Sequence, residues 1–350
     1  MLKLLCSNCL KNEGLRLNAW LRGSDTNSLC KNCGSENGRG LDRNQAMNLV
    51  QDFFVRGTVF RGDYGAAPQL VFNEHHAGMV EQNTPEDLVD DVQILSQYLS
   101  IGIFYYGPRA WMLGENYPLN SLRTPEERDD VIERIISEYP SRLLPKSSIL
   151  YRVRINSKST EYSEFDTAPS NLIGNGRFDT SEFPVLYVSE DLEGCVHECR
   201  ATMDDEIHVA SLQPNKDINI LDLSGLYLED GKNEFDSLDM AVHMLFAARK
   251  HAYPITRAIG LKAFERGYDG IQYPSYFSHV RTGTVPFETA GYGISVRRFE
   301  SARSWIEANT AKNIAIFGRP IADNLLRVKS INRVVIRRVS YDLSFGPVGY

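Results

Sequence analysis

Residues 267–275 read Gly-Tyr-Asp-Gly-Ile-Gln-Tyr-Pro-Ser and predict a helix end, a short buried strand and a turn in immediate succession. Gly267 follows the helical stretch 255–266, and glycine readily takes the left-handed conformation found just beyond a helix end. The strand Gly270–Tyr273 then leads to Ser275. Ligand contacts in mixed α/β folds gather just past the carboxyl ends of strands, although serine is also a common turn residue.

The chain before this stretch alternates short strands and helices. Residues 149–153 and 184–188 are strand-like, and the turn Gly174-Asn175-Gly176 lies between them. Ser189 is expected to cap the helix that follows, since its first turn is acidic. Glu198 lies just off the apolar stripe of this helix, which consists of Leu192, Cys195, Val196, Cys199 and Met203. This alternation predicts an α/β (α+β) fold.

The region from 41 to 145 is predicted to be mostly helical. Thr84-Pro85-Glu86-Asp87 and Thr124-Pro125-Glu126-Glu127 are both typical helix starts. Apolar stripes follow each start, formed by Leu88, Val92 and Leu95 and by Val131, Ile132, Ile135 and Ile136. Proline residues at 140 and 145 indicate a boundary. We therefore expect three segments, 1–40, 41–145 and 146–350, the last with a core at about 149–300 and a C-terminal strand extension.

Four of the six cysteines lie in the first segment, in the pattern C-x2-C-x20-C-x2-C formed by Cys6, Cys9, Cys30 and Cys33. Paired thiolates at this spacing are typical of a zinc ribbon, and four protein ligands indicate structural rather than catalytic Zn²⁺. Cys195 and Cys199 are i, i+4 neighbours on a helix and are expected to pack in the core. The ribbon is mildly basic with a single aromatic residue, Trp20, so a structural or partner-docking role is at least as well supported as nucleic-acid binding.

Composition restricts the function classes further. The chain has 350 residues, with 38 basic and 45 acidic side chains and a formal charge of −7. This balance argues against a general nucleic-acid or membrane-surface binder. Neither a membrane-spanning apolar run nor a signal-peptide core is present, so the expected location is the cytoplasm.

Several ordered motifs resemble the RES domain family, which is named for its Arg, Glu and Ser. The resemblance covers roughly residues 149–300 and rests on Leu150-Tyr151-Arg152, Gly176-Arg177-Phe178, Val185-Leu186-Tyr187-Val188-Ser189, His197-Glu198 and the stretch 267–275. One departure is Phe178-Asp179, where shorter RES toxins usually have Trp-Asn. The front of the chain, with Phe53-Phe54-Val55-Arg56-Gly57 and Tyr106-Gly107-Pro108-Arg109, resembles the HEPN-like domain attached to some RES proteins.

The resemblance implies an ADP-ribosyltransferase-like fold and an activity on NAD. Known members degrade NAD by phosphorolysis or hydrolysis and act as toxins beside an antitoxin, and some relatives have been proposed to modify proteins. It implies catalytic roles for Glu198, Arg152 and Ser275, and NAD binding by Arg177, Tyr187 and Tyr273. Cleavage of the nicotinamide–ribose bond develops positive charge on the ribose, which a carboxylate such as Glu198 stabilises. Phosphate capture needs an anion pocket, which Arg177 and the turn 174–176 could supply.

Other functions remain open at this stage. The HEPN resemblance suggests a ribonuclease, but none of the seven histidines follows an arginine at the four-to-six-residue spacing of that family. A non-catalytic zinc-ribbon adaptor is a further alternative, and no G-x-G-x-x-G motif follows a strand to support an oxidoreductase. The pair His75-His76 could bind metal or lie in a solvated loop. The basic tail 327–338 is expected to be an edge strand that either protects that edge or contacts an acidic partner. The number of chains that assemble cannot be predicted.

Overall fold

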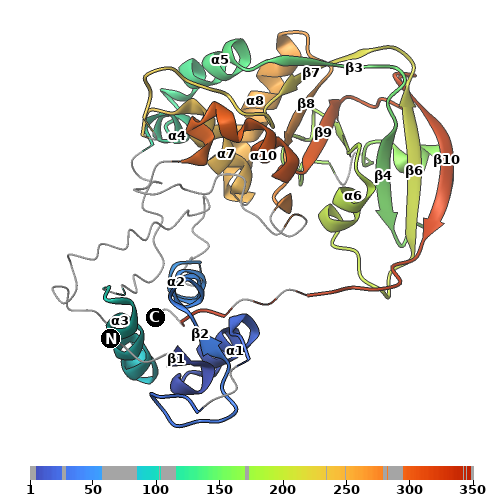
Figure 1. Cartoon of the computed structure of the whole chain (residues 1–350). Helices are drawn as coiled ribbons and strands as arrows, with labels where there is room; N and C mark the ends of the chain where they lie inside the picture. The colour runs from blue at the N-terminus through green and yellow to red at the C-terminus, as the bar shows by residue number, and fades with distance from the viewer. Residues whose placement is uncertain are drawn as a thin grey trace.

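The computed structural model describes residues 5–25, 29–56, 85–101, 103, 116–169, 173–233, 235–248, 250–278, 282, 295–341, 343 and 345–347. They form a small N-terminal lobe and a larger lobe (Figure 1). His75, His76 and the Tyr106–Arg109 motif lie outside the described residues.

The N-terminal lobe surrounds one apolar core that includes the completely buried rings of Phe53 and Phe54. The carboxylate of Asp91 accepts backbone hydrogen bonds from Lys11 and Asn12, both 2.7 Å long, and so fastens its own helix to the cysteine-bearing segment. The elements are β1 (Leu5–Cys6), η1 (Ser7–Cys9), α1 (Glu13–Arg22), β2 (Gly40–Leu41), α2 (Arg43–Val50), the π-helical turn η2 (Gln51–Arg56), η3 (Glu86–Leu88) and α3 (Val89–Leu99).

The larger lobe contains two sheets. The five-stranded sheet has the order β3-β7-β8-β9-β5, and its β7–β8 pair is parallel. The three-stranded antiparallel sheet has the order β10-β6-β4. The strands are β3 (Ser141–Leu144), β4 (Leu150–Ile155), β5 (Val185–Val188), β6 (Ile207–Pro214), β7 (Ile218–Asp222), β8 (Gly270–Pro274), β9 (Lys312–Phe317) and β10 (Leu326–Val334).

Helices cover one face of the five-stranded sheet, and the three-stranded sheet covers the other (Figure 1). The layer between the sheets is aliphatic, with Leu186, Leu212 and Ile316 fully buried there. The helices of this lobe are α4 (Tyr117–Arg123), α5 (Arg128–Glu138), η4 (Tyr162–Phe165), α6 (Leu192–Glu198), α7 (Leu238–Ala247), η5 (Lys250–Ala252), α8 (Tyr253–Glu265), η7 (Val296–Arg298), η8 (Glu300–Ala302) and α10 (Arg303–Asn309). The expected α/β class is confirmed.

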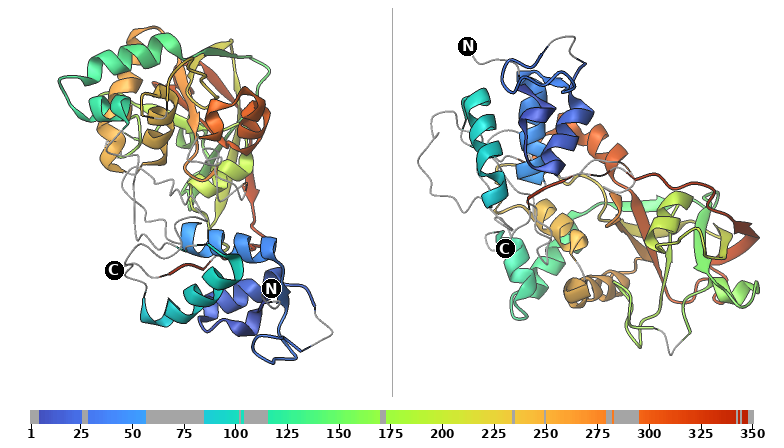
Figure 2. Two further views of the ribbon diagram at one scale, coloured as in Figure 1. Left: turned by 60° about the vertical axis from the view of Figure 1, so that its left-hand side comes forward. Right: turned by 90° about the horizontal axis from the view of Figure 1, so that it is seen from below.

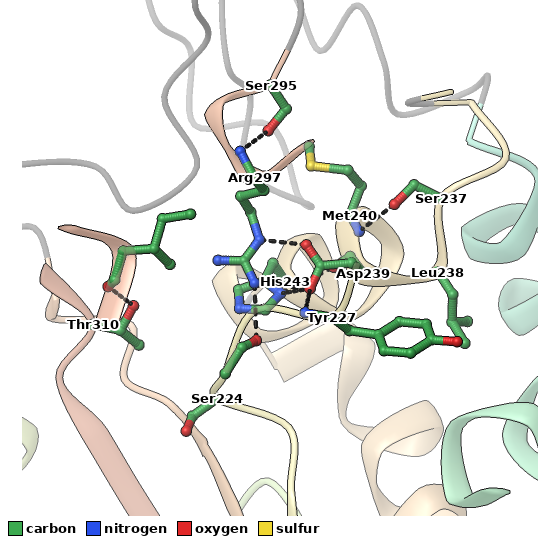
Figure 3. Close-up of polar contacts among 12 residues, drawn as sticks. Ser224, Tyr227, Ser237, Leu238, Asp239, Met240, His243, Ser295, Arg297 and Thr310 are labelled. Carbon is green, nitrogen blue, oxygen red and sulfur yellow. Dashed lines mark hydrogen bonds and ion pairs between the residues drawn. The ribbon is translucent and has the colours of Figure 1, made fainter. Parts of the chain in front are cut away.

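A buried ion pair anchors η7 to α7. Arg297 donates from Nε and Nη2 to the carboxylate of Asp239, at 2.5 and 2.8 Å, and both side chains are almost completely buried (Figure 3). His243 lies one turn further along α7, and its Nδ1 is 2.9 Å from the backbone oxygen of Asp239. Charges removed from water in this way must be paired, so the pair fixes η7 against the helical layer.

The C-terminal tail connects the two lobes. It leaves β10, the edge strand of the three-stranded sheet, and crosses to the N-terminal lobe (Figure 2). Phe345 packs against the core of that lobe beside Gly14 in α1. The expectation of an edge strand in the tail is therefore confirmed, and the residues beyond the strand belong to a contact between lobes.

The two apolar cores do not follow the segment boundaries that were expected at residues 40 and 145. Described residues from both ends of the segment between Leu5 and Ile103 share one core, whereas α4 and α5 pack with α7 and α8 of the larger lobe. Strand β3, also before residue 145, lies at the edge of the five-stranded sheet. In addition, β9 is an inner strand of that sheet although it lies beyond the expected core limit at 300. The division of the chain into domains remains a prediction.

Candidate active site and cysteine cluster

Glu198 is the last residue of α6. The expected cap at Ser189 is wrong, because Asp191 is the N-cap and accepts from the backbone of Glu193. Ser189 instead donates to the backbone of Lys312 and accepts from that of Asp191. The expected stripe was also too long, since α6 ends at Glu198 and Met203 is 57% exposed. The helix is therefore short, and its final turn presents the carboxylate.

Ser275 and Asn313 both hold the carboxylate of Glu198. The Ser275 hydroxyl and the Asn313 side-chain amide each donate to Oε1 of Glu198, with distances of 2.5 Å. Ser275 lies just past β8, as expected, and its Oγ also accepts from the backbone of Phe277 at 3.0 Å. Asn313 comes from β9, the strand next to β8. Two strands and one helix thus meet at a single carboxylate oxygen.

Arg152 lies where the two sheets meet. Strands β4 and β5 are joined there by a bridge between Tyr151 and Ser189, and Arg152 donates from Nη1 to the backbone oxygen of Tyr187 at 2.9 Å. Its Nε is buried without a hydrogen-bond partner among the described residues. Burial, and secondarily the neighbouring Arg154, lowers the pKa of Arg152 to about 10, so it remains cationic at neutral pH.

The turn at 174–179 is fastened to β5 by Tyr187. The Tyr187 hydroxyl donates to the carboxylate of Asp179 at 2.7 Å and accepts from the backbone of Phe178 at 2.8 Å. Gly176 packs so closely against these groups that an added Cβ would lie 2.0 Å from an Asp179 oxygen. Tyr187 also lines the site, and its hydroxyl holds the turn in place.

Other hydrogen bonds bear on the expected anion pocket at this turn. The backbone N–H of Gly174 donates to Asp179 at 2.5 Å. The backbone oxygens of Gly174 and Gly176 accept from Arg257 of α8. The Gly174 N–H is therefore not available to bind an anion, because it already donates to the Asp179 carboxylate.

Arg177 follows the turn and lies over aromatic rings. Its guanidinium carbon is 5.0 Å from the centre of the Tyr253 ring and 5.5 Å from that of Phe246. Its two terminal nitrogens donate to the backbone oxygens of Leu245 and Ala248 near the end of α7, at 3.3 and 3.1 Å. These contacts hold the guanidinium group of Arg177 at the cavity wall. Stacking over aromatic rings is favourable for such a planar cation.

Tyr273 on β8 is mostly enclosed by other rings. It stacks on Phe246 with centroids 5.3 Å apart and meets Phe178 edge to face at 5.1 Å. Phe178, the departure from the usual Trp, is fully buried in the same cluster. Burial, and then the negative charge of Glu198, raises the pKa of Tyr273, so its hydroxyl stays protonated.

These residues line one cavity of about 730 Å³. The cavity brings together five of the six expected active-site residues, and the sixth, Ser275, touches Glu198 directly. In the described part of the chain, the walls combine aromatic rings with four cationic side chains and the carboxylate of Glu198. The lining residues are Arg152, Val153, Gly176, Arg177, Tyr187, Val188, Cys195, Glu198, Cys199, Arg200, Ala248, Lys250, Tyr253, Tyr273, Tyr276, Phe277 and Asn313.

Cys195 and Cys199 also border the cavity, and they pack as expected. Both belong to a small apolar cluster between α6 and the three-stranded sheet. Their thiols point to backbone oxygens of β4, with Cys195 Sγ 3.3 Å from that of Tyr151. Burial raises the pKa of Cys195 to about 12 and also raises that of Cys199, so both remain unreactive thiols at neutral pH.

The four N-terminal cysteines converge at a separate place, in the small lobe. Their sulfur atoms all lie within 4.8 Å of one another, and the Cys6–Cys9, Cys6–Cys33 and Cys9–Cys30 distances are 3.7, 3.5 and 3.6 Å. Sulfurs placed about 2.3 Å from one tetrahedral ion would be about 3.8 Å apart. The cluster therefore has the size and the donor set to hold a metal ion.

Sequence reasoning did not identify Asn313, Arg200, Lys250, Tyr253 and Phe277 as parts of the site. One signal was available for Asn313, which is a polar residue in the otherwise apolar run Asn313-Ile-Ala-Ile-Phe317. Arg200 has a left-handed backbone, with φ of 53°, which is uncommon for a residue other than glycine and is not visible in a sequence.

The comparisons with known proteins agree with the position of this cavity. Residues 149–286 match the family model described as the RES domain. No curated protein and no solved structure matches the chain. No helix in the described part of the chain has the length and apolar character needed to cross a membrane. The matched segment carries Arg152, Glu198 and Ser275 in the expected order, and the chain therefore contains a RES domain.

Proposed function

We propose that the protein is an enzyme that cleaves the nicotinamide–ribose bond of NAD⁺, by phosphorolysis or hydrolysis, and acts as a bacterial toxin or defence effector in the cytoplasm. The observation that carries this proposal is the position of Glu198. Among the residues that the structure describes, it is the one carboxylate lining the cavity, and the other charged side chains in the lining are Arg152, Arg177, Arg200 and Lys250. The RES domain, whose members act on NAD, supports the same substrate.

The charges of the cavity suit a dinucleotide with a pyrophosphate. Guanidinium groups bind such oxygens with paired N–H donors, and Arg152 has a buried Nε that lacks a partner among the described residues. A buried donor of this kind is satisfied when an anionic ligand binds. The rings of Tyr253, Tyr276 and Phe277 provide apolar surfaces for the bases. The family resemblance assigns NAD binding to Arg177, Tyr187 and Tyr273, which line the same cavity, and the Tyr187 hydroxyl positions the turn.

Glu198 provides the chemistry. As nicotinamide departs, positive charge develops on the ribose, and a carboxylate facing it lowers the energy of the transition state. Ser275 keeps this carboxylate in place, because its hydroxyl donates to Oε1. Arg152 neutralises the pyrophosphate while the bond breaks. Phosphate or water then captures the ribosyl cation.

We also propose that the Cys6, Cys9, Cys30 and Cys33 cluster binds one structural Zn²⁺. With four sulfur ligands the ion has no open position for a substrate, and it would stabilise the fold of the small lobe. The small lobe, with its zinc ribbon and HEPN-like region, is then a candidate for contacts with an antitoxin or another regulatory protein.

The proposal is tested by incubating the purified protein with NAD⁺ and following nicotinamide release. Wild type should release nicotinamide, whereas Glu198→Gln should lose at least about 100-fold in kcat, the cost typical of removing one such electrostatic group. Glu193→Gln is the matched control, since Glu193 lies in the first turn of the same helix but does not line the cavity. No nicotinamide release by wild type, or equal activity of both variants, would reject the proposal.

A further inference from the structure

We propose that Asn313 is a positioning residue that orients Glu198, so that the RES site of this chain is completed by a strand outside the matched domain. This inference rests on the proposed function of Glu198. Asn313 lies on β9, at 27 residues beyond the end of the matched segment 149–286.

The first support is that Asn313 is itself rigidly held. It lies near the start of β9 and pairs with Tyr273 of β8 across the five-stranded sheet. Asn313 is only 5% exposed, so its amide projects from an inner strand of the sheet into packed surroundings. Glu198, by contrast, is an exposed residue at the end of a helix of seven residues. A rigid donor therefore meets a side chain that needs an external constraint.

The second support is the shared target of the two donors. Asn313 Nδ2 and Ser275 Oγ both donate to Oε1 of Glu198, and neither hydrogen bond uses Oε2. Hydrogen bonds to an ionised carboxylate are stronger than those between neutral groups. Two such bonds at one oxygen fix the plane of the carboxylate and leave Oε2 as the oxygen that faces a substrate in the cavity.

The third support is the free-energy cost of burying the Asn313 amide beside apolar residues. Residues 314–317 are all buried and apolar. A buried amide beside them lowers the stability of the fold unless it is hydrogen-bonded. The bond to Glu198 compensates this cost and links the inner strand β9 to the end of α6. Ser275 alone would hold the carboxylate by one rotatable hydroxyl, whereas the amide adds a second, planar constraint.

The kinetic test compares Asn313→Leu, which has a similar volume but no donor, with Asn313→Ser, which keeps a donor at shorter reach. Loss of a hydrogen bond to a charged group should lower kcat for NAD⁺ by about 10- to 100-fold in Asn313→Leu. The KM for NAD⁺ should change by less than about threefold, because Asn313 orients the catalytic carboxylate and does not hold the substrate. Asn313→Ser should recover part of the lost kcat. Thermal unfolding of each variant establishes that it is folded.

A second measurement does not depend on activity. The side-chain amide resonances of Asn313, assigned in the wild-type protein by sequential triple-resonance experiments, should shift strongly in Glu198→Ala and remain in place in Glu193→Ala. Unchanged resonances in Glu198→Ala would overturn the inference even if the Asn313 variants fail to fold. Wild-type kcat in a folded Asn313→Leu would overturn it as well. An inactive wild type with a shifted Asn313 amide would instead reject the proposed function and leave the contact with Glu198 established.

Discussion

Asp239 and Arg297, separated by 58 residues in the sequence, form an ion pair in which both side chains are at most 3% exposed (Figure 3). His243 lies against the same pair, with its Nδ1 3.6 Å from an Asp239 oxygen. Burial first, and the positive charge of Arg297 second, lower the pKa of His243 to about 4, whereas the ordinary value is 6.5. His243 is therefore neutral at pH 7, and the Asp239 charge is balanced by Arg297.

This arrangement predicts that stability falls as the pH drops from 6.5 to 4. In that window the unfolded chain binds a proton at His243 that the folded chain does not, so the free energy of unfolding decreases. The pKa difference corresponds to a loss of about 3 kcal/mol across the window. Denaturant unfolding at several pH values should show the loss, and His243→Gln should reduce it. His251→Gln, at an exposed position, is the control and should behave as wild type. A pH dependence that is unchanged in His243→Gln would contradict the assignment.

Asp239 contributes in a lower pH range. Although burial is the largest influence and opposes ionisation, the charge of Arg297 and the hydrogen bonds it donates leave the pKa of Asp239 below the ordinary value of an aspartate. A carboxyl with a lowered pKa stabilises the fold above its unfolded value and loses this contribution as the pH falls through the folded value. Asp239→Asn lacks this contribution at every pH. Its acid unfolding should therefore begin at a higher pH than that of wild type.

The cysteine cluster predicts one zinc per chain in the purified protein. Cys30→Ser should lose the metal and destabilise the small lobe, because a structural zinc contributes directly to folding. Gly38→Ala should weaken metal binding without removing a ligand, since the added Cβ would lie 2.5 Å from Cys6 Sγ. Gly225→Ala, whose Cβ would meet open space, is the matched control. Metal analysis and unfolding curves measure both effects, and a metal-free wild type with a fully folded small lobe would refute the prediction.

The contact between the tail and the small lobe also has a measurable consequence. Phe345 is partly buried against the N-terminal core, so Phe345→Ala should destabilise this contact by about 2 kcal/mol, roughly half the cost of removing a fully buried ring. The described residues 335–341 of the tail should then become more sensitive to limited proteolysis. Tyr341→Ala is the control, since Tyr341 is 82% exposed. Equal proteolysis of the two variants would mean that Phe345 does not hold the tail.

Local signals in the sequence were sufficient to predict several elements of the larger lobe. Gly267 has the left-handed φ of 86° expected beyond a helix end, and Ser237 caps α7 by accepting from the backbone of Met240. These features depend on neighbouring residues, so a single sequence reveals them. The apolar stripe of α5 is buried as expected for the same reason, because its period matches the helix.

The parts that could not be predicted depend on contacts between distant residues. Ser189 looked like a helix cap, but its hydroxyl bonds the backbone of Lys312, more than a hundred residues away. Likewise, no local pattern indicates that Asn313 would lie beside Glu198, or that α5 would pack on α8 rather than with the small lobe. The candidate site was predicted as a set of residue types through a family resemblance, whereas the hydrogen bonds that orient those residues follow only from the strand order.

The final prediction concerns the group that accepts the ribosyl cation. Water and phosphate are small acceptors that need no docking surface, and the cationic side chains described in the wall of the cavity attract phosphate. Transfer to a protein side chain would also need a surface that docks the target beside Glu198. With NAD⁺ labelled in the adenylate half, we expect free ADP-ribose or its 1″-phosphate and no labelled protein. Adding phosphate at constant ionic strength distinguishes the two products, because only phosphorolysis accelerates. Stable transfer of the label to a protein, with little free product, would show that the enzyme is instead a protein ADP-ribosyltransferase.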